Sequence, residues 1–470
     1  MGSGTTARTS YVQPAKGLEL NAATLLTIYI VVLFAVPSNL TFTPLGSLGR
    51  PSIWCGLLLL GWWVFARLQL SAPEEPIVRQ PVRGALILLV VIALASFAAA
   101  MLGGQPSDQV SPAFTSLIRL ASWSGVLLVA MDGLRTTDEL VAVVRRLVVV
   151  VALMAVLGLA QFVTGDTLLG WLQSVPGLAL DSSGIQARGD YTRAAATATH
   201  PLEYGVALIG VLPLALVAAS TGGFNQRRPG TGLSATLRAP AIVWWLPVGV
   251  IALASMLAVS RSALIGLMVC VIASLPALSR PYRWLVVGGG FVAAIGVAVI
   301  SPGLPQTMIN MFLAIGDDPS ALSRTNALDR IPQFMATSWF AVLIGRGFGT
   351  FLPRYQIFDD QWALTAVELG VLGLAALLGV AIAAIASAIR ARRSAQSTEL
   401  RAIASALCAS MLAVCVDFLF FDGLSFPISA GLYFLIAGLA GAALKVSVLE
   451  AVETDRSAPQ NRPSSRILQR

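Results

Sequence analysis

Long apolar stretches alternate with shorter polar connections along most of this chain. Twelve stretches of about 17–25 residues are each long enough to cross a hydrocarbon core roughly 30 Å thick. Backbone groups in lipid must bond to one another, so runs of this length predict helices. The stretches centre near residues 21–36, 52–69, 84–102, 113–131, 141–163, 201–220, 240–257, 261–278, 283–301, 361–389, 402–420 and 427–446. We therefore expect an all-α polytopic membrane protein with about twelve transmembrane helices.

The polar segments divide this pattern into five parts. The expected parts are a cytoplasmic N-terminal tail (1–18), helices one to nine (19–301), a large extracytoplasmic loop (302–360), helices ten to twelve (361–446) and a disordered cytoplasmic tail (447–470). No AxA-like cleavage site precedes the first span, which is expected to act as the insertion signal. No internal repeat is visible, so the inverted-repeat architecture of many transporters is not indicated.

Lysine and arginine are distributed unevenly between the two sides that these spans imply. Of the 31 basic residues, all but nine fall on the side of the termini when alternate connections are assigned to alternate sides. The positive-inside rule makes that side cytoplasmic, which predicts a multi-pass protein of the cell membrane with both termini inside. The nine exceptions are Arg50, Arg119, Arg188, Arg193, Arg261, Arg324, Arg330, Arg346 and Arg354. Arginines that oppose the sorting rule suggest an anionic ligand on the outer side.

Composition supports a membrane protein and excludes several other classes. The chain is 56% hydrophobic and 11% charged, with a mean hydropathy of +0.79. The net charge of +8 lies mostly in short inner connections, where orientation and anionic lipid explain it, so no nucleic-acid partner is expected. All four cysteines lie inside predicted spans and there is one histidine, so neither a metal site nor a cofactor is predicted.

The connection at 164–200 ends in a polar motif at the start of the sixth span. Pro201 suits the first helical position, where its missing N–H would be unpaired anyway. Glu203 then lies in the first turn, where it either complements the helix dipole or binds substrate. His200 is either a capping residue or a proton acceptor, and Arg193 is close enough in sequence to share a site with it.

Ser260, Arg261 and Ser262 interrupt almost forty residues of otherwise apolar sequence. A guanidinium at this position needs a salt bridge, access to the membrane surface, a water-filled cavity or an anion to compensate its charge. Arginine fits a diphosphate well, because its planar group donates two charge-assisted bonds to phosphate oxygens. We therefore assign Arg261 to a candidate anion site.

The large outer loop supplies further candidate binding residues. Glycines at 345, 347 and 349 resemble a phosphate loop only superficially, since no strand precedes them, although their amides could approach an anion as nests do. The candidate substrate-binding side chains in this loop are Arg324, Arg330, Arg346 and Tyr355.

Three carboxylates accompany the start of the tenth span. Asp359 and Asp360 are either solvated loop charges or a pair in which one removes a proton from a sugar hydroxyl and the other orients the sugar. Glu368 lies inside the helix, where a carboxylate is normally paired or functional, and we expect an outer arginine as its partner.

Taken in order, these motifs resemble the superfamily of bacterial O-antigen ligases and O-antigen polymerases over roughly residues 190–380. The resembling features are Arg193 before a small-residue run and Pro201, the pair Ser260–Arg261 opening a span, the stretch from Gly345 to Phe351, and Asp359 followed by Glu368 and Gly370. The His-Pro-Leu-Glu-Tyr-Gly form at 200–205 looks like that of actinobacterial members.

The resemblance implies a GT-C-like membrane glycosyltransferase that needs neither a nucleotide sugar nor a metal. Its donor would be a glycan on undecaprenyl diphosphate, bound by Arg193 and Arg261 from outside the membrane. The acceptor would be a hydroxyl of a glycan or lipid, with membrane lipids surrounding the protein. Ligases of this family commonly place His-Asn where this chain has Asp359-Asp360. Asp359 is therefore the expected base, with His200 second, and the choice between ligase and polymerase stays open.

Two other classes of function are compatible with the sequence. A transporter or flippase for polysaccharide or lipid-linked glycan suits twelve spans with both termini inside. It would require charges deep in the central spans, whereas the charges of this chain gather near the predicted outer surface. A non-catalytic scaffold for envelope assembly is the third possibility.

Overall fold

A computed structural model describes residues 21–69, 78–180, 186–188, 191–224, 240–258, 260–300, 319–335, 339–351 and 358–457, together with residues 303, 306 and 309. Each of the twelve predicted stretches contains a helix in this structure. In the described residues, nine helices are long and apolar enough to cross a membrane. They are α2 (Pro51–Gln69), α3 (Pro81–Leu102), α4 (Ser107–Gly133), α5 (Thr137–Thr164), α6 (Pro201–Ser220), α10 (Arg280–Ile300), α14 (Gln361–Ser394), α15 (Thr398–Asp417) and α16 (Pro427–Ser457).

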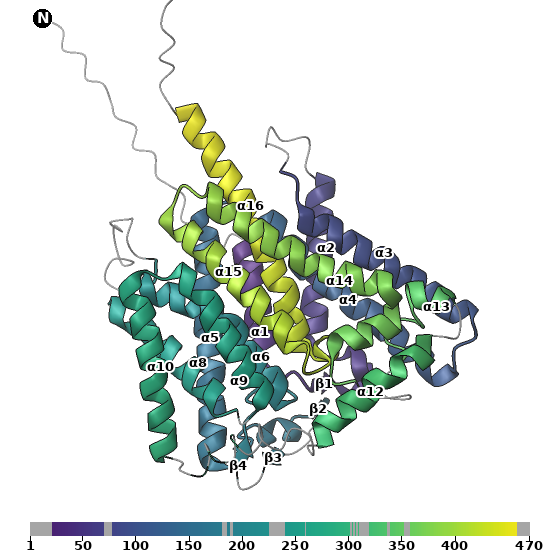
Figure 1. Ribbon diagram of the computed structural model, residues 1–470. Helices are drawn as coiled ribbons and strands as arrows, with labels where there is room; N and C mark the ends of the chain where they lie inside the picture. The colour runs from purple at the N-terminus through teal and green to yellow at the C-terminus, as the bar shows by residue number, and fades with distance from the viewer. Residues whose placement is uncertain are drawn as a thin grey trace, which may run out of the picture.

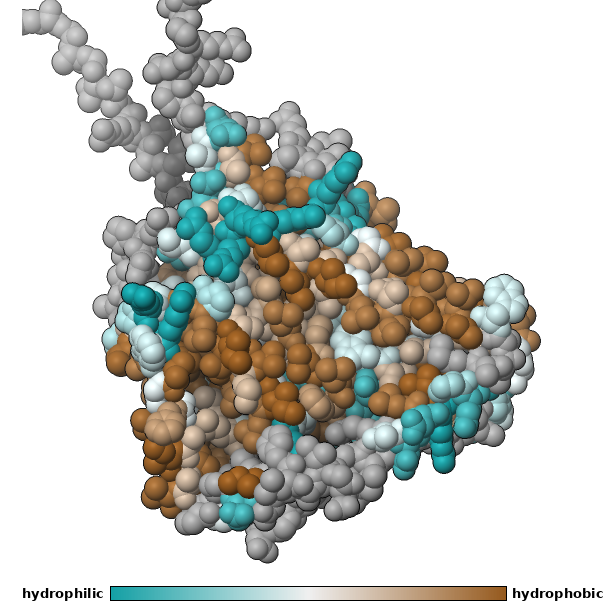
Figure 2. Space-filling view, in the orientation of Figure 1, coloured by the Kyte–Doolittle hydropathy of each residue, from teal (hydrophilic) through white to brown (hydrophobic). Residues whose placement is uncertain are grey.

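Three predicted spans form shorter helices. These are α1 (Ala22–Ala35), α8 (Trp245–Met256) after the 3-10 turn η3 (Ala241–Trp244), and α9 (Arg261–Ser274) before η4 (Leu275–Ala277). On the face shown in Figure 2, hydrophobic side chains cover the middle of the molecule and hydrophilic ones lie mainly toward its ends. The expectation of a helical, multi-pass membrane protein is thus confirmed.

Four short strands mark one end of the helix bundle. β1 (Leu40–Phe42) follows α1, and it pairs antiparallel with β2 (Leu178–Leu180), which follows α5. β3 (Gln186–Arg188) pairs with β4 (Tyr191–Arg193), just before α6. All four lie together, opposite the C-terminal end of α16 (Figure 1). We call this end of the bundle the strand end.

The opposite end is held by a cluster around Asp132, the residue before the last in α4. Its carboxylate accepts hydrogen bonds from Arg67 at 2.6 Å and from Arg83, and its carbonyl accepts one from Lys445 at 2.8 Å. Arg67 lies near the end of α2, Arg83 near the start of α3 and Lys445 within α16. The structure therefore places the predicted inner connections together, away from the strands.

The helices α6 and α16 form the centre of the bundle, whereas α10 lies at its edge (Figure 1). A helix that is apolar on all sides is suited to full burial. α16 approaches α4 closely at Gly438, where an added Cβ would lie 2.7 Å from the carbonyl oxygen of Leu127. Small residues allow this close approach between membrane helices.

α16 extends further than the sequence suggested. The predicted disordered tail begins at residue 447, but the helix continues to Ser457. The hydroxyl of Thr137, the first residue of α5, donates a 2.6 Å hydrogen bond to Glu450 and holds this extension against the bundle. The prediction of disorder was therefore wrong for residues 447–457, which continue α16 and contact α5 through Glu450.

The predicted outer loop contains helices of its own, α12 (Pro319–Met335) and α13 (Trp339–Ile344), which pack against α14. α14 is interrupted at Gly370, whose φ of 69° and ψ of −172° are not helical. The break deprives the carbonyls of Val367 and Glu368 of helical donors. They accept instead from the amides of Arg346 at 3.1 Å and Gly347 at 3.0 Å. The glycine-rich turn thus replaces the hydrogen bonds that α14 loses.

Replacement of Gly370 by alanine tests the requirement for this break. The backbone region is unfavourable for side chains, and an added Cβ would lie 2.4 Å from the carbonyl carbon of Leu343. We expect Gly370→Ala to destabilise the protein by at least about 2 kcal/mol, measured as a lower apparent Tm in detergent. Gly379→Ala is the matched control on the same helix, because its added Cβ meets only Ala85, at 4.0 Å. Equal Tm values for the two variants would contradict this account.

Candidate functional site

The connection between α15 and α16, residues 418–426, lies at the centre of the strand end and includes the short turn η5 (Gly423–Ser425). We call it the α15–α16 loop. Gln361, the first residue of α14, holds it from one side. The backbone amide of Gln361 donates to the carbonyl of Phe418 at 2.8 Å. The side-chain oxygen of Gln361 accepts a hydrogen bond from the backbone amide of Leu424 at 2.7 Å. No motif in this short connection predicts that it would organise the site.

Glu203 binds the start of α16, directly after this loop. Its buried carboxylate accepts hydrogen bonds from the Ile428 amide at 2.7 Å, the Thr199 amide at 2.8 Å and the Ser38 hydroxyl at 3.1 Å. The position predicted for Glu203, in the first turn of α6, is confirmed. Its oxygens, however, accept hydrogen bonds from three other segments of the protein itself. This geometry favours a structural role over the predicted contact with substrate.

His200 is the N-cap residue of α6, and its Nδ1 accepts the Leu202 amide at 3.1 Å. Burial, and secondarily the positive charge of Arg193, lower the pKa of His200 to about 4. At neutral pH the other nitrogen, Nε2, therefore carries the single proton and is a donor. The ring lies 5.9 Å from that of Phe426 in the α15–α16 loop. The capping alternative is thus supported, whereas a role as base stays a prediction.

Arg193 precedes α6, and Arg261 begins α9. Arg193 ends β4 and is near enough to His200 for their charges to interact. Arg261 is the first residue of α9, and its side chain is half-buried. A Cβ added at Gly205 of α6 would lie 3.5 Å from the Cβ of Ala263. The first turns of α6 and α9 are therefore packed side by side at the strand end.

Asp359 lies close to a carboxylate that the sequence did not single out, Asp422 of the α15–α16 loop. Burial raises the pKa of Asp422 to about 6, the charge of Asp359 adds to this increase, and a hydrogen bond from Ser425 opposes it. Glu368 is also near enough to Asp422 for their charges to interact. Asp422 is 63 residues from Asp359 in sequence, so only the fold reveals this pair.

Asp360 has a different role from its neighbour. Its side chain accepts the amides of Trp362 at 2.8 Å and Ala363 at 3.1 Å, which makes it the N-cap of α14. Such a cap satisfies amides that a helix start leaves unpaired. The adjacent aspartates are thus not equivalent, and the predicted sugar-orienting role of Asp360 has no support in this geometry.

Glu368 is bound by the glycine-rich turn and not by an arginine. Its carboxylate accepts the amide of Phe351 at 3.3 Å and also that of Gly349. In the described part of the chain no arginine forms an ion pair with it. Positive φ angles at Gly345, Gly347 and Gly349 allow the turn to pack against the α14 break. The anion that this turn binds is therefore the protein's own carboxylate.

Two arginines that were not chosen as site residues come together at the strand end. Arg50, just before α2, and Arg119 of α4 are close enough to repel each other. Both line a narrow cavity together with Ser425 and Pro427. Arg50 is also attracted by the Glu203 carboxylate. The α15–α16 loop thus has arginines on one side and carboxylates on another.

The remaining predicted binding residues are in or near α12 and the glycine-rich turn, or lie outside the described residues. Arg330 is exposed on α12, and Arg346 is half-buried in the glycine-rich turn. Arg324 belongs to α12, and Tyr355 lies outside the described residues. A further carboxylate missed by the sequence analysis, Asp417 at the end of α15, is buried against Gly266 of α9, with no hydrogen-bond partner found for its Oδ2 in the described structure.

The structure also bears on metal binding and on relatives. Among the described residues there is no group of three or more His, Cys, Asp or Glu side chains that could hold a metal ion. The chain matches no protein-family model, and no curated protein is significantly similar to it. The function must therefore be inferred from the site itself.

Replacement of His200 by asparagine tests its role as a neutral cap. The folded-state pKa of His200 is about 4, below its ordinary value, so protons favour the unfolded chain and stability falls as the pH decreases below about 6.5. Asparagine can also accept the Leu202 amide but does not titrate. Between about pH 7.5 and pH 5, we expect the free energy of unfolding of the wild type to fall by up to about 2 kcal/mol, which lowers its apparent Tm. The apparent Tm of His200→Asn should fall less over the same range. Identical pH profiles would contradict the assignment.

Proposed function

We propose that this protein transfers a glycan from undecaprenyl diphosphate to an acceptor hydroxyl at the strand end of the bundle. The observation that carries the proposal is the meeting of arginines and an aspartate pair around the α15–α16 loop. The resemblance of the motifs at 190–380 to O-antigen ligases and polymerases supports the same reaction. We further propose twelve spans, with residues 302–360 outside the cell membrane.

Orientation follows from the distribution of charge. The cluster of Arg67, Arg83 and Lys445 around Asp132 lies opposite the strand end. The positive-inside rule makes the end with the excess of basic residues cytoplasmic. The strand end then faces outward, where lipid-linked glycans are assembled into surface polysaccharide.

The chemistry needs a leaving group and a base. The acceptor oxygen attacks the anomeric carbon of the reducing-end sugar, and the bond from that carbon to the diphosphate oxygen breaks. Arg193 and Arg261 neutralise the charge that develops on the departing diphosphate, as electrostatic stabilisation requires. The proton of the acceptor hydroxyl passes to a carboxylate. Carrier diphosphate and lengthened acceptor are the products.

Asp359 is the base in this scheme. Its partner carboxylate is Asp422 and not Asp360. Because Asp422 is charged only above about pH 6, its ionisation adds a negative charge beside Asp359. A neighbouring negative charge raises the proton affinity of a carboxylate and makes it a stronger base. His200 is not needed in this role.

A transporter or flippase for lipid-linked glycan is the alternative from another class. It would move the carrier between leaflets without forming a glycosidic bond. In the described structure, Arg50 and Arg119 border the α15–α16 loop, and Asp359 lies near Asp422 of the same loop. This arrangement suits a surface-facing catalytic site better than a transport path.

Arg261→Ala tests the proposed diphosphate site. Loss of one charge-assisted donor to the leaving group should lower glycan transfer by about 100-fold or more in a purified system. Arg280→Ala is the matched control, because Arg280 is an exposed arginine at the first position of another helix, α10. Wild-type levels of glycan product from folded Arg261→Ala protein would remove Arg261 from the mechanism.

The aspartate pair is tested by the pH dependence of transfer. The wild-type rate should rise through about pH 6 as the proton leaves Asp422. Asp422→Asn should abolish this rise, and Asp359→Asn should lower the rate by about 10²–10⁴-fold at all pH values. Asp166→Asn, at an exposed carboxylate beyond the end of α5, serves as the control. An unchanged acid limb in Asp422→Asn would refute the coupling.

A further inference from the structure

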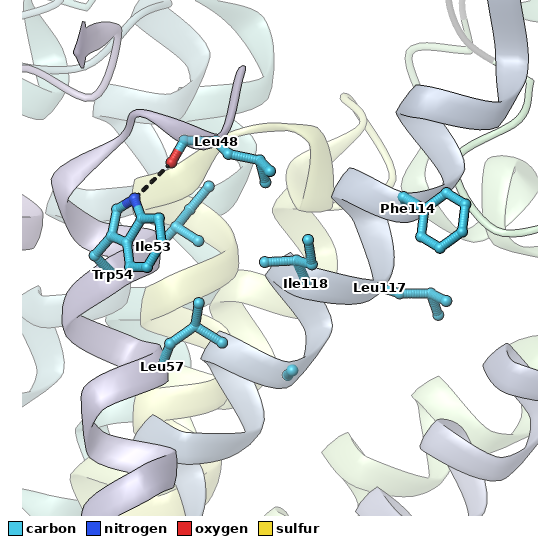
Figure 3. A pocket seen from close by; sticks show the side chains of 8 residues that line it. Leu48, Ile53, Trp54, Leu57, Phe114, Leu117 and Ile118 are labelled. Carbon is cyan, nitrogen blue, oxygen red and sulfur yellow. Dashed lines mark hydrogen bonds between the residues drawn. The ribbon is translucent and has the colours of Figure 1, made fainter. Parts of the chain in front are cut away.

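An apolar groove runs between α2 and α4 at the strand end. It has a volume of about 300 Å³, and its walls include Leu48, Trp54, Leu57, Phe114, Leu117 and Ile118. Figure 3 shows side chains of both helices around this space. The indole N–H of Trp54 donates to the Leu48 carbonyl at 2.9 Å, so the polar atom of this ring is satisfied within the protein. Trp54 and Phe114 are 45% and 52% exposed, and the groove is therefore open at the protein surface.

The arginine cavity adjoins this groove. Ile53 borders both spaces, and Arg119 directly follows Ile118 in α4. The cavity also contacts Ser425 and Pro427, next to the loop that carries Asp422. A continuous surface thus leads from the apolar groove, past Arg50 and Arg119, to the α15–α16 loop.

The charges in the cavity favour an anion. Arg50 and Arg119 repel each other, and Arg119 has its Nε buried without a hydrogen-bond partner in the described structure. The Glu203 carboxylate attracts Arg50, but its oxygens already accept bonds from three other groups. Arg119 thus has a buried, unsatisfied N–H group and a second guanidinium close by. A phosphate or diphosphate would offset the repulsion between the two arginines and accept N–H groups from them.

We infer that the α2–α4 groove binds the prenyl chain of the lipid-diphosphate donor and that Arg50 and Arg119 bind its phosphates at the groove mouth. This inference rests on the proposed function and extends it by giving the carrier a lateral path from the bilayer. The groove supplies an apolar surface for the first units of the chain. The arginine pair orients the headgroup toward the α15–α16 loop, where Arg193 and Arg261 take over the leaving group.

Binding of undecaprenyl diphosphate to the full-length protein in nanodiscs tests the inference without requiring turnover. Arg119→Gln should weaken this binding by about 10-fold or more, because it removes a charge-assisted donor. Ala121→Phe fills the groove and should weaken it as well. Ala95→Phe is the matched control, since Ala95 is an exposed alanine on α3 outside the groove. Gel filtration and the apparent Tm establish that each variant is folded.

Two further probes separate the headgroup from the chain. Free pyrophosphate should bind more weakly to Arg119→Gln and normally to Ala121→Phe. A photoreactive undecaprenyl diphosphate analogue should label the wild-type protein within residues 48–57 or 114–121, which needs no variant. Labelling confined to other segments would overturn the inference.

The remaining outcomes are equally informative. If phosphatidylglycerol binds as tightly as undecaprenyl diphosphate and is equally sensitive to Ala121→Phe, the groove is a general phospholipid site and the inference is wrong. If Arg119→Gln and Ala121→Phe bind and react normally while Arg261→Ala does not react, the inference fails and the proposed function stands. If the wild type binds the carrier but forms no glycosidic bond, the proposed function fails instead.

Discussion

The buried carboxylate of Glu203 is the interaction on which the strand end depends. A carboxylate removed from water costs several kcal/mol unless donors surround it. Ser38, Thr199 and Ile428 supply those donors from three separate segments. These segments must therefore meet at the start of α6. Their meeting fixes the α15–α16 loop, and with it the surroundings of every candidate group.

The α15–α16 loop separates two kinds of charge. Arg50, Arg119 and Arg193 approach from the side of α2, α4 and α6, whereas Asp359 and Asp422 lie toward α14. A reaction that expels a diphosphate and accepts a proton requires such a division, because the cations stabilise the leaving group and must not neutralise the base. Asp360 caps a helix, and Glu368 accepts backbone amides. The interacting pair of carboxylates is therefore Asp359 and Asp422, which belongs to the loop itself.

Local signals in the sequence were sufficient for the helices and for some of their starting points. Apolar length gave the spans, and the helices begin at Pro201, Arg261 and Gln361 as the flanking residues indicated. The partners of those residues could not be predicted, because they come from distant segments. Asp422 has no motif around it, and Arg119 lies within an apolar run. The break at Gly370 depends on a turn that replaces its lost hydrogen bonds, which no periodicity reveals.

Reconstitution tests the central claim most directly. The purified protein in liposomes receives a glycan on undecaprenyl diphosphate and an acceptor glycan, and the products are analysed by mass spectrometry. The account predicts a new glycosidic bond and release of undecaprenyl diphosphate without added metal or nucleotide sugar. Movement of the intact carrier between leaflets with no new bond would contradict it.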